Sequence, residues 1–113
     1  MLVPLLALAM QAPADLAKRS ALYLQCKAYI TLIDKAREVD SGAMLDAGVC
    51  LGYMGGFAET RVAAKSLCAP SASAGALVRV YIAYMDKYPK LMDEPRWVGV
   101  GLALEDAYGC PVK

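Results

Sequence analysis

The sequence predicts an all-α protein, a small four-helix bundle of irregular, orthogonal type that is held together by two disulfide bonds. Three observations support this fold class. Apolar residues recur at helical spacing along most of the chain, and no alternating pattern typical of a β-strand continues for more than a few residues. The length of 113 residues suits a single domain. Four cysteines occur at well-separated positions, 26, 50, 68 and 110.

The first helix is expected to begin at about Leu16. Its apolar side consists of residues three and four positions apart, and the side ends in a charged residue: Leu22, Cys26, Tyr29, Ile30, Ile33 and Arg37. The stretch 34–40 becomes polar. Asp40-Ser41-Gly42 should then break the helix, because Asp and Gly favour turns.

A second helix is expected from about Ala43 to Ala64. Three glycines spaced four residues apart share one side of it, namely Gly48, Gly52 and Gly56. Each glycine within a helix costs about 1 kcal/mol relative to alanine. We expect this cost to be offset by another helix that packs very close to the glycines. A membrane dimer motif is the alternative, but Glu59, Arg61 and Lys65 cut the apolar run short.

The third and fourth helices follow two segments that favour turns. Cys68-Ala69-Pro70-Ser71 marks a turn, after which Ser71 or Ser73 can cap a helix from about Ala74 to Tyr88. The segment from Tyr88 to Pro95 is expected to be a loop, since it is bracketed by Pro89 and Pro95. Asp93 can cap the last helix, with Pro95 just inside its start and Gly109 at its end.

The composition argues against catalysis and against nucleic-acid binding. The 12 basic and 11 acidic residues nearly cancel without forming clusters, and the chain has no histidine for a catalytic pair or a metal site. The adjacent carboxylates Asp93/Glu94 and Glu105/Asp106 point to different sides of a helix. Gly52-x-x-Gly55-Gly56 lacks the Lys-Ser/Thr ending of a phosphate loop. We therefore expect no enzyme, no cofactor and no metal.

The N-terminus suggests export. Residues 1–9 are uncharged and apolar, too short to cross a bilayer as a helix, and end in the small-x-small pattern Ala7-Leu8-Ala9. We interpret them as the remnant of a signal peptide; an apolar turn packed on the domain is the alternative. Nothing after Ala9 is apolar for long enough to span a membrane.

An even number of cysteines in a short exported chain predicts two disulfides, and the absence of C-x-x-C spacing disfavours a metal site.

The tyrosines and the proline-bracketed loop are the candidate partner-binding residues. Tyr81, Tyr84 and Tyr88 share one side of the third helix, beside a second apolar side. They either cover the edge of the core or form a protein interface. The loop adds an apolar pair flanked by charges: Lys90, Leu91, Met92, Asp93 and Glu94. Pro89 and Pro95 should restrict this segment, and Trp97 after it is expected to be a core anchor.

Several motifs together resemble the Rap1a/Tai family of type VI secretion immunity proteins over residues 20–111. These are Cys26, Cys50-x-Gly52-Tyr53-x-x-Gly56, Cys68-x-Pro70, Lys87-Tyr88-Pro89, Ala103-Leu104 and Cys110. The resemblance implies a helical fold, a periplasmic location, disulfides and a homodimer. It also implies that the protein binds and blocks a secreted peptidoglycan amidase effector, which requires no chemistry of its own. Tyr108-Gly109-Cys110 departs from the family pattern, which often has a proline before the last cysteine.

Two further expectations accompany this resemblance. Among the three ways of pairing four cysteines, we favour Cys26–Cys50 and Cys68–Cys110. The alternative function, from a different class, is a small disulfide-linked periplasmic chaperone that binds many clients through an exposed apolar surface.

Overall fold

The computed structural model describes residues 19–34, 40–68 and 72–111. Its elements in chain order are α2 (Arg19–Asp34), α3 (Ser41–Ala63), α4 (Ala74–Lys87), the 3₁₀ helix η1 (Pro89–Asp93) and α5 (Arg96–Tyr108). The predicted all-α fold class is confirmed, with four α-helices and two disulfides. The proposed signal remnant at 1–9, the expected helix start at Leu16, and Arg37, Pro70 and Ser71 lie outside the described residues.

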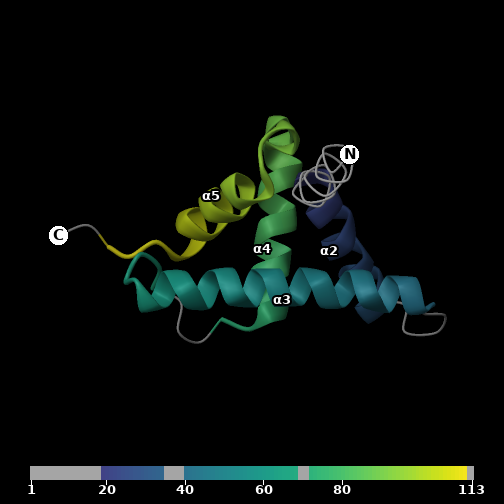
Figure 1. Cartoon of the computed structure of the whole chain (residues 1–113). Coiled ribbons are helices and arrows are strands. Elements are labelled where there is room, and N and C mark those ends of the chain that lie inside the picture. Colours follow the sequence, from purple (N-terminus) through teal and green to yellow (C-terminus); the bar gives the residue numbers. More distant parts are fainter. Residues whose placement is uncertain (1–18, 35–39, 69–71, 112–113) are drawn as a thin grey trace, which may run out of the picture.

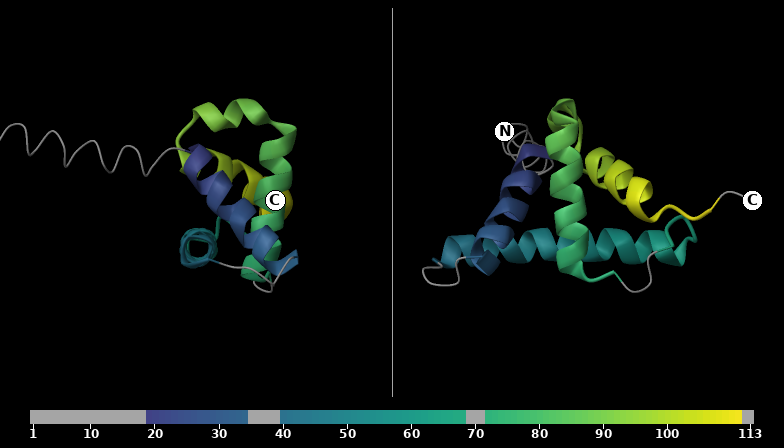
Figure 2. Two further views of the ribbon diagram at one scale, coloured as in Figure 1. Left: turned by 90° about the vertical axis from the view of Figure 1, so that its right-hand side faces the viewer. Right: turned by 180° about the vertical axis from the view of Figure 1, so that it is seen from behind.

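The helices are arranged irregularly, with one helix crossing the others. The long α3 runs nearly at a right angle to α4, which rises from it between α2 on one side and α5 on the other (Figure 1). The view along α3 shows that η1 spans the far end of the molecule from α3, connecting α4 to α5 (Figure 2). The two ends of the fold are therefore different, since α3 occupies one and η1 the other.

The helix starts follow from local capping. The Asp40 side chain accepts a hydrogen bond from the Ala43 backbone N–H at 2.7 Å, so α3 begins at Ser41, slightly earlier than expected. The Ser73 hydroxyl oxygen caps α4 in the same way, 3.1 Å from the Ala76 nitrogen. The prediction that Asp93 caps α5 with Pro95 inside the helix is wrong. Pro95 is itself the N-cap because its backbone is extended (ψ 147°), and no side-chain cap bond is made.

The helix ends also have identifiable causes. After α3, the Lys65 N–H bonds to the Val62 carbonyl and the Ser66 N–H to the Arg61 carbonyl, each at 2.9 Å. Lys65 is left-handed at φ 62°, so the turn is a Schellman motif formed without glycine. Gly109 ends α5 as predicted, and its N–H bonds to the Glu105 carbonyl at 2.8 Å.

A hydrophobic core joins the four described α-helices. Its buried members are Leu22, Cys26, Cys50, Met54, Ala58, Leu67, Leu77, Val78, Tyr81, Met85, Val100, Ala103 and Leu104. The first-helix prediction is confirmed for Leu22 and Cys26, which are fully buried, whereas Ile33 near the end of α2 is exposed. The side chains of α2 are therefore less buried toward the end of the helix, which extends past the shared core.

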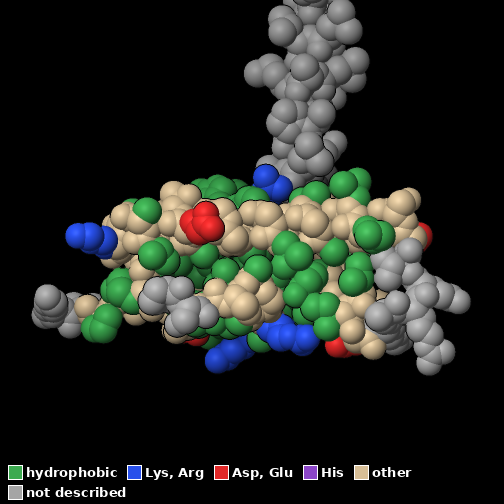
Figure 3. All heavy atoms as spheres, turned by 90° about the horizontal axis from the view of Figure 1, so that it is seen from below, with side chains coloured by type: hydrophobic (Ala, Val, Ile, Leu, Met, Phe, Trp, Pro, Cys, Tyr) green, Lys and Arg blue, Asp and Glu red, His purple; other side chains and the backbone are tan. Residues whose placement is uncertain are grey.

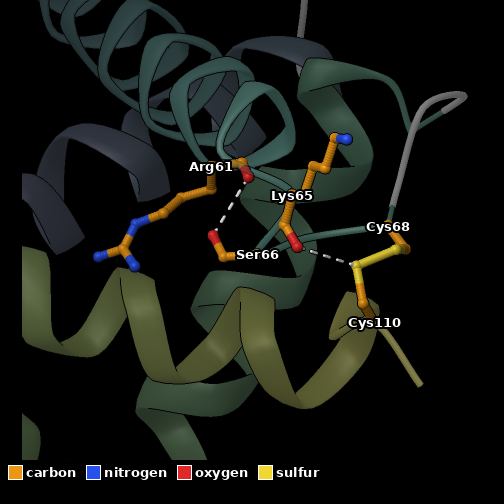
Figure 4. The surroundings of a disulfide bond; sticks show 5 residues. All are labelled: Arg61, Lys65, Ser66, Cys68 and Cys110. Atoms are coloured by element: carbon orange, nitrogen blue, oxygen red, sulfur yellow. Dashed lines mark hydrogen bonds between the residues drawn. A yellow bond between two sulfur atoms is a disulfide. The ribbon is translucent and has the colours of Figure 1, made fainter. Parts of the chain in front are cut away.

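Both predicted disulfides form. Cys26–Cys50 joins α2 to α3, and both residues are fully buried. Cys68–Cys110 joins the segment after α3 to the C-terminal segment, where Cys68 is exposed. The Cys68 N–H also bonds to the Tyr108 carbonyl at 2.8 Å, so the two segments are held by backbone and sulfur together. Figure 4 shows this region, in which the Cys110 sulfur lies 3.6 Å from the Lys65 carbonyl oxygen.

The glycine prediction for α3 is wrong. Gly48, Gly52 and Gly56 are exposed, and a Cβ atom placed on any of them would meet nothing within 4 Å. The reason is the orientation of α3, which buries Ala47, Cys50, Met54 and Ala58 instead. No helix of the described chain therefore covers these glycines.

Candidate functional site

The segment between α4 and α5 is a short helix and not a loop. Pro89 occupies its first turn, where the missing N–H costs nothing. The backbone then turns tightly, with the Leu91 N–H bonded to the Tyr88 carbonyl at 3.0 Å and the Glu94 N–H bonded to the Leu91 carbonyl at 3.1 Å. These bonds fix the backbone of η1 locally.

Packing fixes η1 to the rest of the protein. Leu91 and Met92 are partly buried and pack against the core, and η1 contacts α2, α4 and α5. Although this apolar pair was a candidate for partner binding, the 3₁₀ turn directs both side chains toward the core. Lys90, Asp93 and Glu94 are exposed around the same segment, as the charged flanks were expected to be.

Two aromatic side chains lie exposed on either side of η1. Tyr88, which precedes it, is 44% exposed, and Trp97, in the first turn of α5, is 58% exposed. The expectation that Trp97 anchors the core is wrong, since α5 turns Val100, Ala103 and Leu104 inward and the space beside Gly99 is filled by Met85 and Tyr81. A large aromatic ring is thus left at the surface next to a rigid segment.

The three tyrosines of α4 do not act as one surface. Tyr81 is fully buried, so its expected role in partner binding is wrong. Its hydroxyl has no hydrogen-bond partner among the described residues, and burial raises its pKa well above the usual tyrosine value. Tyr81 is buried because it lies near the middle of α4, where α5 covers it. Tyr84 and Tyr88 lie nearer the end of the helix and remain accessible, with ring centroids 4.8 Å apart.

The surface around η1 is charged as well as aromatic. The Lys87 amine lies 5.5 Å from the centre of the Tyr88 ring, a cation–π geometry. Tyrosine and tryptophan are among the side chains most enriched at the hot spots of protein–protein interfaces. The arrangement can present a preformed surface to a partner. Among the described residues, no group of histidine, cysteine or acidic side chains is placed to hold a metal.

Comparison with known proteins decides the family. The model of the family described as Rap1a immunity proteins matches residues 18–110, which is most of the chain. The chain belongs to the Rap1a immunity protein family. Searches of curated proteins and of solved structures gave no significant match. The resemblance found in the motifs is confirmed, and membership implies binding of a partner effector.

The motifs of this Rap1a family chain have distinct structural roles. The four cysteines form the two disulfides, and Tyr53 is partly buried against the core. Gly52 and Gly56 leave an open surface on α3. Pro89 begins η1. In the described part of the chain, no helix is both long and apolar enough to span a membrane.

Sequence reasoning missed a set of side chains on α3 and α5. The Arg61 guanidinium lies 4.9 Å from the Phe57 ring centre, and that of Arg96 lies 4.4 Å from the Tyr53 ring centre. The i, i+4 spacing of Phe57 and Arg61 is a signal that could have found the first pair. No signal in the sequence predicts the second, because Arg96 comes from another helix.

Proposed function

We propose that this chain is a periplasmic immunity protein of a type VI secretion system. In this proposal it binds a peptidoglycan amidase effector and blocks it by covering the active-site cleft. Membership of the Rap1a immunity family supports the general role. Two disulfides support a location in an oxidising compartment such as the periplasm. The family resemblance also supports a homodimer, which sedimentation of the purified chain would measure.

The observation that carries this proposal is the exposure of Tyr88 and Trp97 on either side of η1. Because Leu91 and Met92 hold η1 against the core, the segment loses little conformational entropy when a partner binds. A rigid element with exposed aromatic rings and charged neighbours suits insertion into a cleft, which needs apolar atoms for the pocket and polar atoms for orientation. Tyr84, Lys90, Asp93 and Glu94 would complete the surface.

The test is inhibition of a peptidoglycan amidase effector of a type VI secretion system from the same organism, measured as hydrolysis of purified peptidoglycan. We expect the double substitution Tyr88→Ala with Trp97→Ala to lower affinity by about thirtyfold or more, since the loss of even one hot-spot side chain costs about 2 kcal/mol. Leu24→Ala is the control, because Leu24 is a large hydrophobic residue that is even more exposed, at 65%, but lies on α2. Substituting Leu91 and Met92 is less informative, since both pack against the core.

Two results would contradict the proposal. Full inhibition by the correctly folded double variant would place the binding surface elsewhere. Failure of the unaltered chain to bind the amidase, together with suppression of aggregation of several unrelated unfolded proteins, would support the chaperone alternative.

A further inference from the structure

An aromatic and basic surface lies on α3, apart from η1. Tyr53, Phe57 and Arg61 are spaced four residues apart and so lie in a row along the helix. The rings of Tyr53 and Phe57 are stacked with centroids 6.1 Å apart, and the Arg61 guanidinium continues the row over Phe57. From α5, Arg96 lies over Tyr53, and together with burial against the core this fixes the first ring in place.

A groove of about 390 Å³ runs beside this row. It is lined by Gly52, Tyr53, Gly56, Phe57, Thr60 and Arg61. The two glycines leave open space above the helix backbone, so another chain can approach it closely. The Thr60 hydroxyl donates to the Gly56 carbonyl at 2.8 Å, which leaves the groove with aromatic rings, bare backbone and one cation.

The charge of the groove is positive. None of its lining residues carries a carboxylate. Glu105 lines an adjoining hollow with Arg61, yet among the described residues no ion pair within 4.0 Å involves Arg61. Contact with Phe57 uses one face of the planar guanidinium and leaves its in-plane N–H groups to bind an acceptor. Figure 4 shows the Arg61 side chain extended away from the neighbouring disulfide.

The wider α3 side of the molecule is apolar. Seen from below, hydrophobic side chains, uncharged polar side chains and backbone make up most of the described surface, and charged side chains are few (Figure 3). Met44, Leu45 and Val49, on the first half of α3, are exposed large hydrophobic residues. The Arg61 guanidinium, on the second half of the same helix, can therefore orient a partner that packs on α3.

We propose that this groove, termed here the Arg61 groove, binds a carboxylate-bearing segment of the effector protein. The carboxylate pairs with the Arg61 guanidinium in a bidentate geometry, and a neighbouring apolar side chain of the segment lies on Gly52 and Gly56 between the rings. This inference rests on the proposed function for the identity of the partner. It adds a second contact region, on α3, to the surface around η1.

The first experiment probes the chemistry of the groove without the effector. The probe is a short synthetic peptide rich in glutamate and leucine, and its control has glutamine in place of glutamate. Chemical-shift changes of the backbone amides are followed by NMR in the full chain. We expect the glutamate peptide to shift Gly52, Gly56 and Phe57 selectively, and the effect to weaken with added salt.

Two matched pairs of variants test the geometry. Arg61→Gln should weaken peptide binding by about tenfold, whereas Lys65→Gln, which removes an exposed cation one turn away outside the groove, should not. Gly56→Leu should block the groove sterically, whereas Gly48→Leu should leave it open. Both glycines have empty space around the added Cβ, so both variants should fold. The same variants are then tested for affinity to the amidase by calorimetry.

The following results would overturn the Arg61 groove. If the glutamine peptide binds as strongly as the glutamate peptide, the carboxylate does not contribute to binding. Equal losses of peptide affinity in Lys65→Gln and Arg61→Gln would show that the peptide is held by non-specific electrostatic attraction. Shifts of Gly52 and Gly56 on raising the protein concentration alone would show a second copy there, and shifts on adding phosphatidylglycerol vesicles would show a lipid surface. Unchanged amidase affinity in Arg61→Gln and Gly56→Leu would overturn the groove while leaving the proposed function intact.

Discussion

The hydroxyl of Tyr23 on α2 donates a hydrogen bond of 2.5 Å to a carboxylate oxygen of Asp86 on α4, and so joins residues 63 positions apart in the sequence. The bond is charge-assisted, the stronger class of hydrogen bond. Above the ring of Tyr23, the Lys27 amine lies 5.8 Å from its centre. Because Asp86 is near the end of α4, this bond holds α2 beside the start of η1.

We expect Tyr23→Phe to lower the free energy of unfolding by about 1 kcal/mol. The bond is lost while the ring and its packing remain, and partial exposure of the site keeps the loss near the lower end for bonds to charged groups. Urea unfolding at neutral pH measures the difference. Tyr29→Phe is the matched control. It also removes a tyrosine hydroxyl from α2, but the Tyr29 hydroxyl makes no hydrogen bond to a described residue. Equal stability of the two variants would show that the Tyr23–Asp86 bond contributes nothing.

Two glycine substitutions should have opposite effects. Gly52→Ala should stabilise the protein by about 0.5–1 kcal/mol, because alanine favours the helix and the added Cβ meets nothing within 4 Å. Gly109→Ala should destabilise it by about 1–3 kcal/mol, since the added Cβ would lie 2.6 Å from the Glu105 carbonyl oxygen. Thermal unfolding measures both. A lower melting temperature for Gly52→Ala would indicate that another protein surface covers α3 in solution.

These glycines show where sequence reasoning fails. Helical spacing predicts which residues share a side of α3, but it does not say which side faces the core. A row of glycines suits close packing and equally suits an open binding surface, because both need backbone without side chains. The disulfide pairs and the helix order depend on local or family patterns and were predicted correctly, and of the two serines expected to cap α4, Ser71 or Ser73, it is Ser73 that does so.

The aromatic residues show a second limit. Helical spacing predicts Tyr81 and Tyr88 on the same side of the third helix, yet Tyr81 in α4 is fully buried and Tyr88, the residue that caps the end of α4, is 44% exposed. Their difference comes from position along the helix relative to α5, which periodicity does not contain. Trp97 was expected to anchor the core just after the proline-bracketed segment, but the inward side of α5 is taken by smaller residues that fit against Tyr81 and Met85.

The two disulfides should be reduced in a fixed order. Cys68 is exposed, whereas Cys26 and Cys50 are both fully buried, so a reductant reaches Cys68–Cys110 first. We expect mild dithiothreitol treatment followed by alkylation to give a species carrying two labels, both on Cys68 and Cys110, before any species with four. Mass spectrometry of the digested protein identifies the labelled residues. Earlier labelling of Cys26 and Cys50 would mean that α2 separates from α3 more readily than the structure indicates.

Removing the hydroxyl of Tyr81 should not harm the fold. The Tyr81 oxygen is buried and has no partner among the described residues, so it carries a desolvation cost in the folded state. We expect Tyr81→Phe to keep or raise the free energy of unfolding, by up to about 1 kcal/mol. Tyr81→Ala should lower it by about 3–5 kcal/mol, because it leaves a cavity between α4 and α5. A clear loss of stability in Tyr81→Phe would reveal a hydrogen bond to a buried water.

The last prediction concerns alkaline pH. The pKa values of three tyrosines are raised above the usual tyrosine value of 10.0 in the folded protein. The hydrogen bond to Asp86 is the main cause for Tyr23, and burial is the main cause for Tyr53 and Tyr81, although Arg96 partly opposes it at Tyr53. In the unfolded chain these groups lose their protons near pH 10, whereas the folded protein keeps them.

The sign of the pH dependence follows from this difference. Above about pH 10 the unfolded state binds fewer protons than the folded state, so the free energy of unfolding falls as pH rises. Below that pH both states are protonated at these tyrosines, and their contribution is constant. We therefore expect the urea midpoint to be insensitive to these groups from pH 8 to about 10 and to decline above it. All described cysteines are in disulfides, so no free thiol among them starts exchange during the measurement. Tyr81→Phe should make the decline shallower, because it removes the tyrosine whose burial raises the pKa most; an unchanged slope in that variant would mean that Tyr81 gains solvent contact in the folded state.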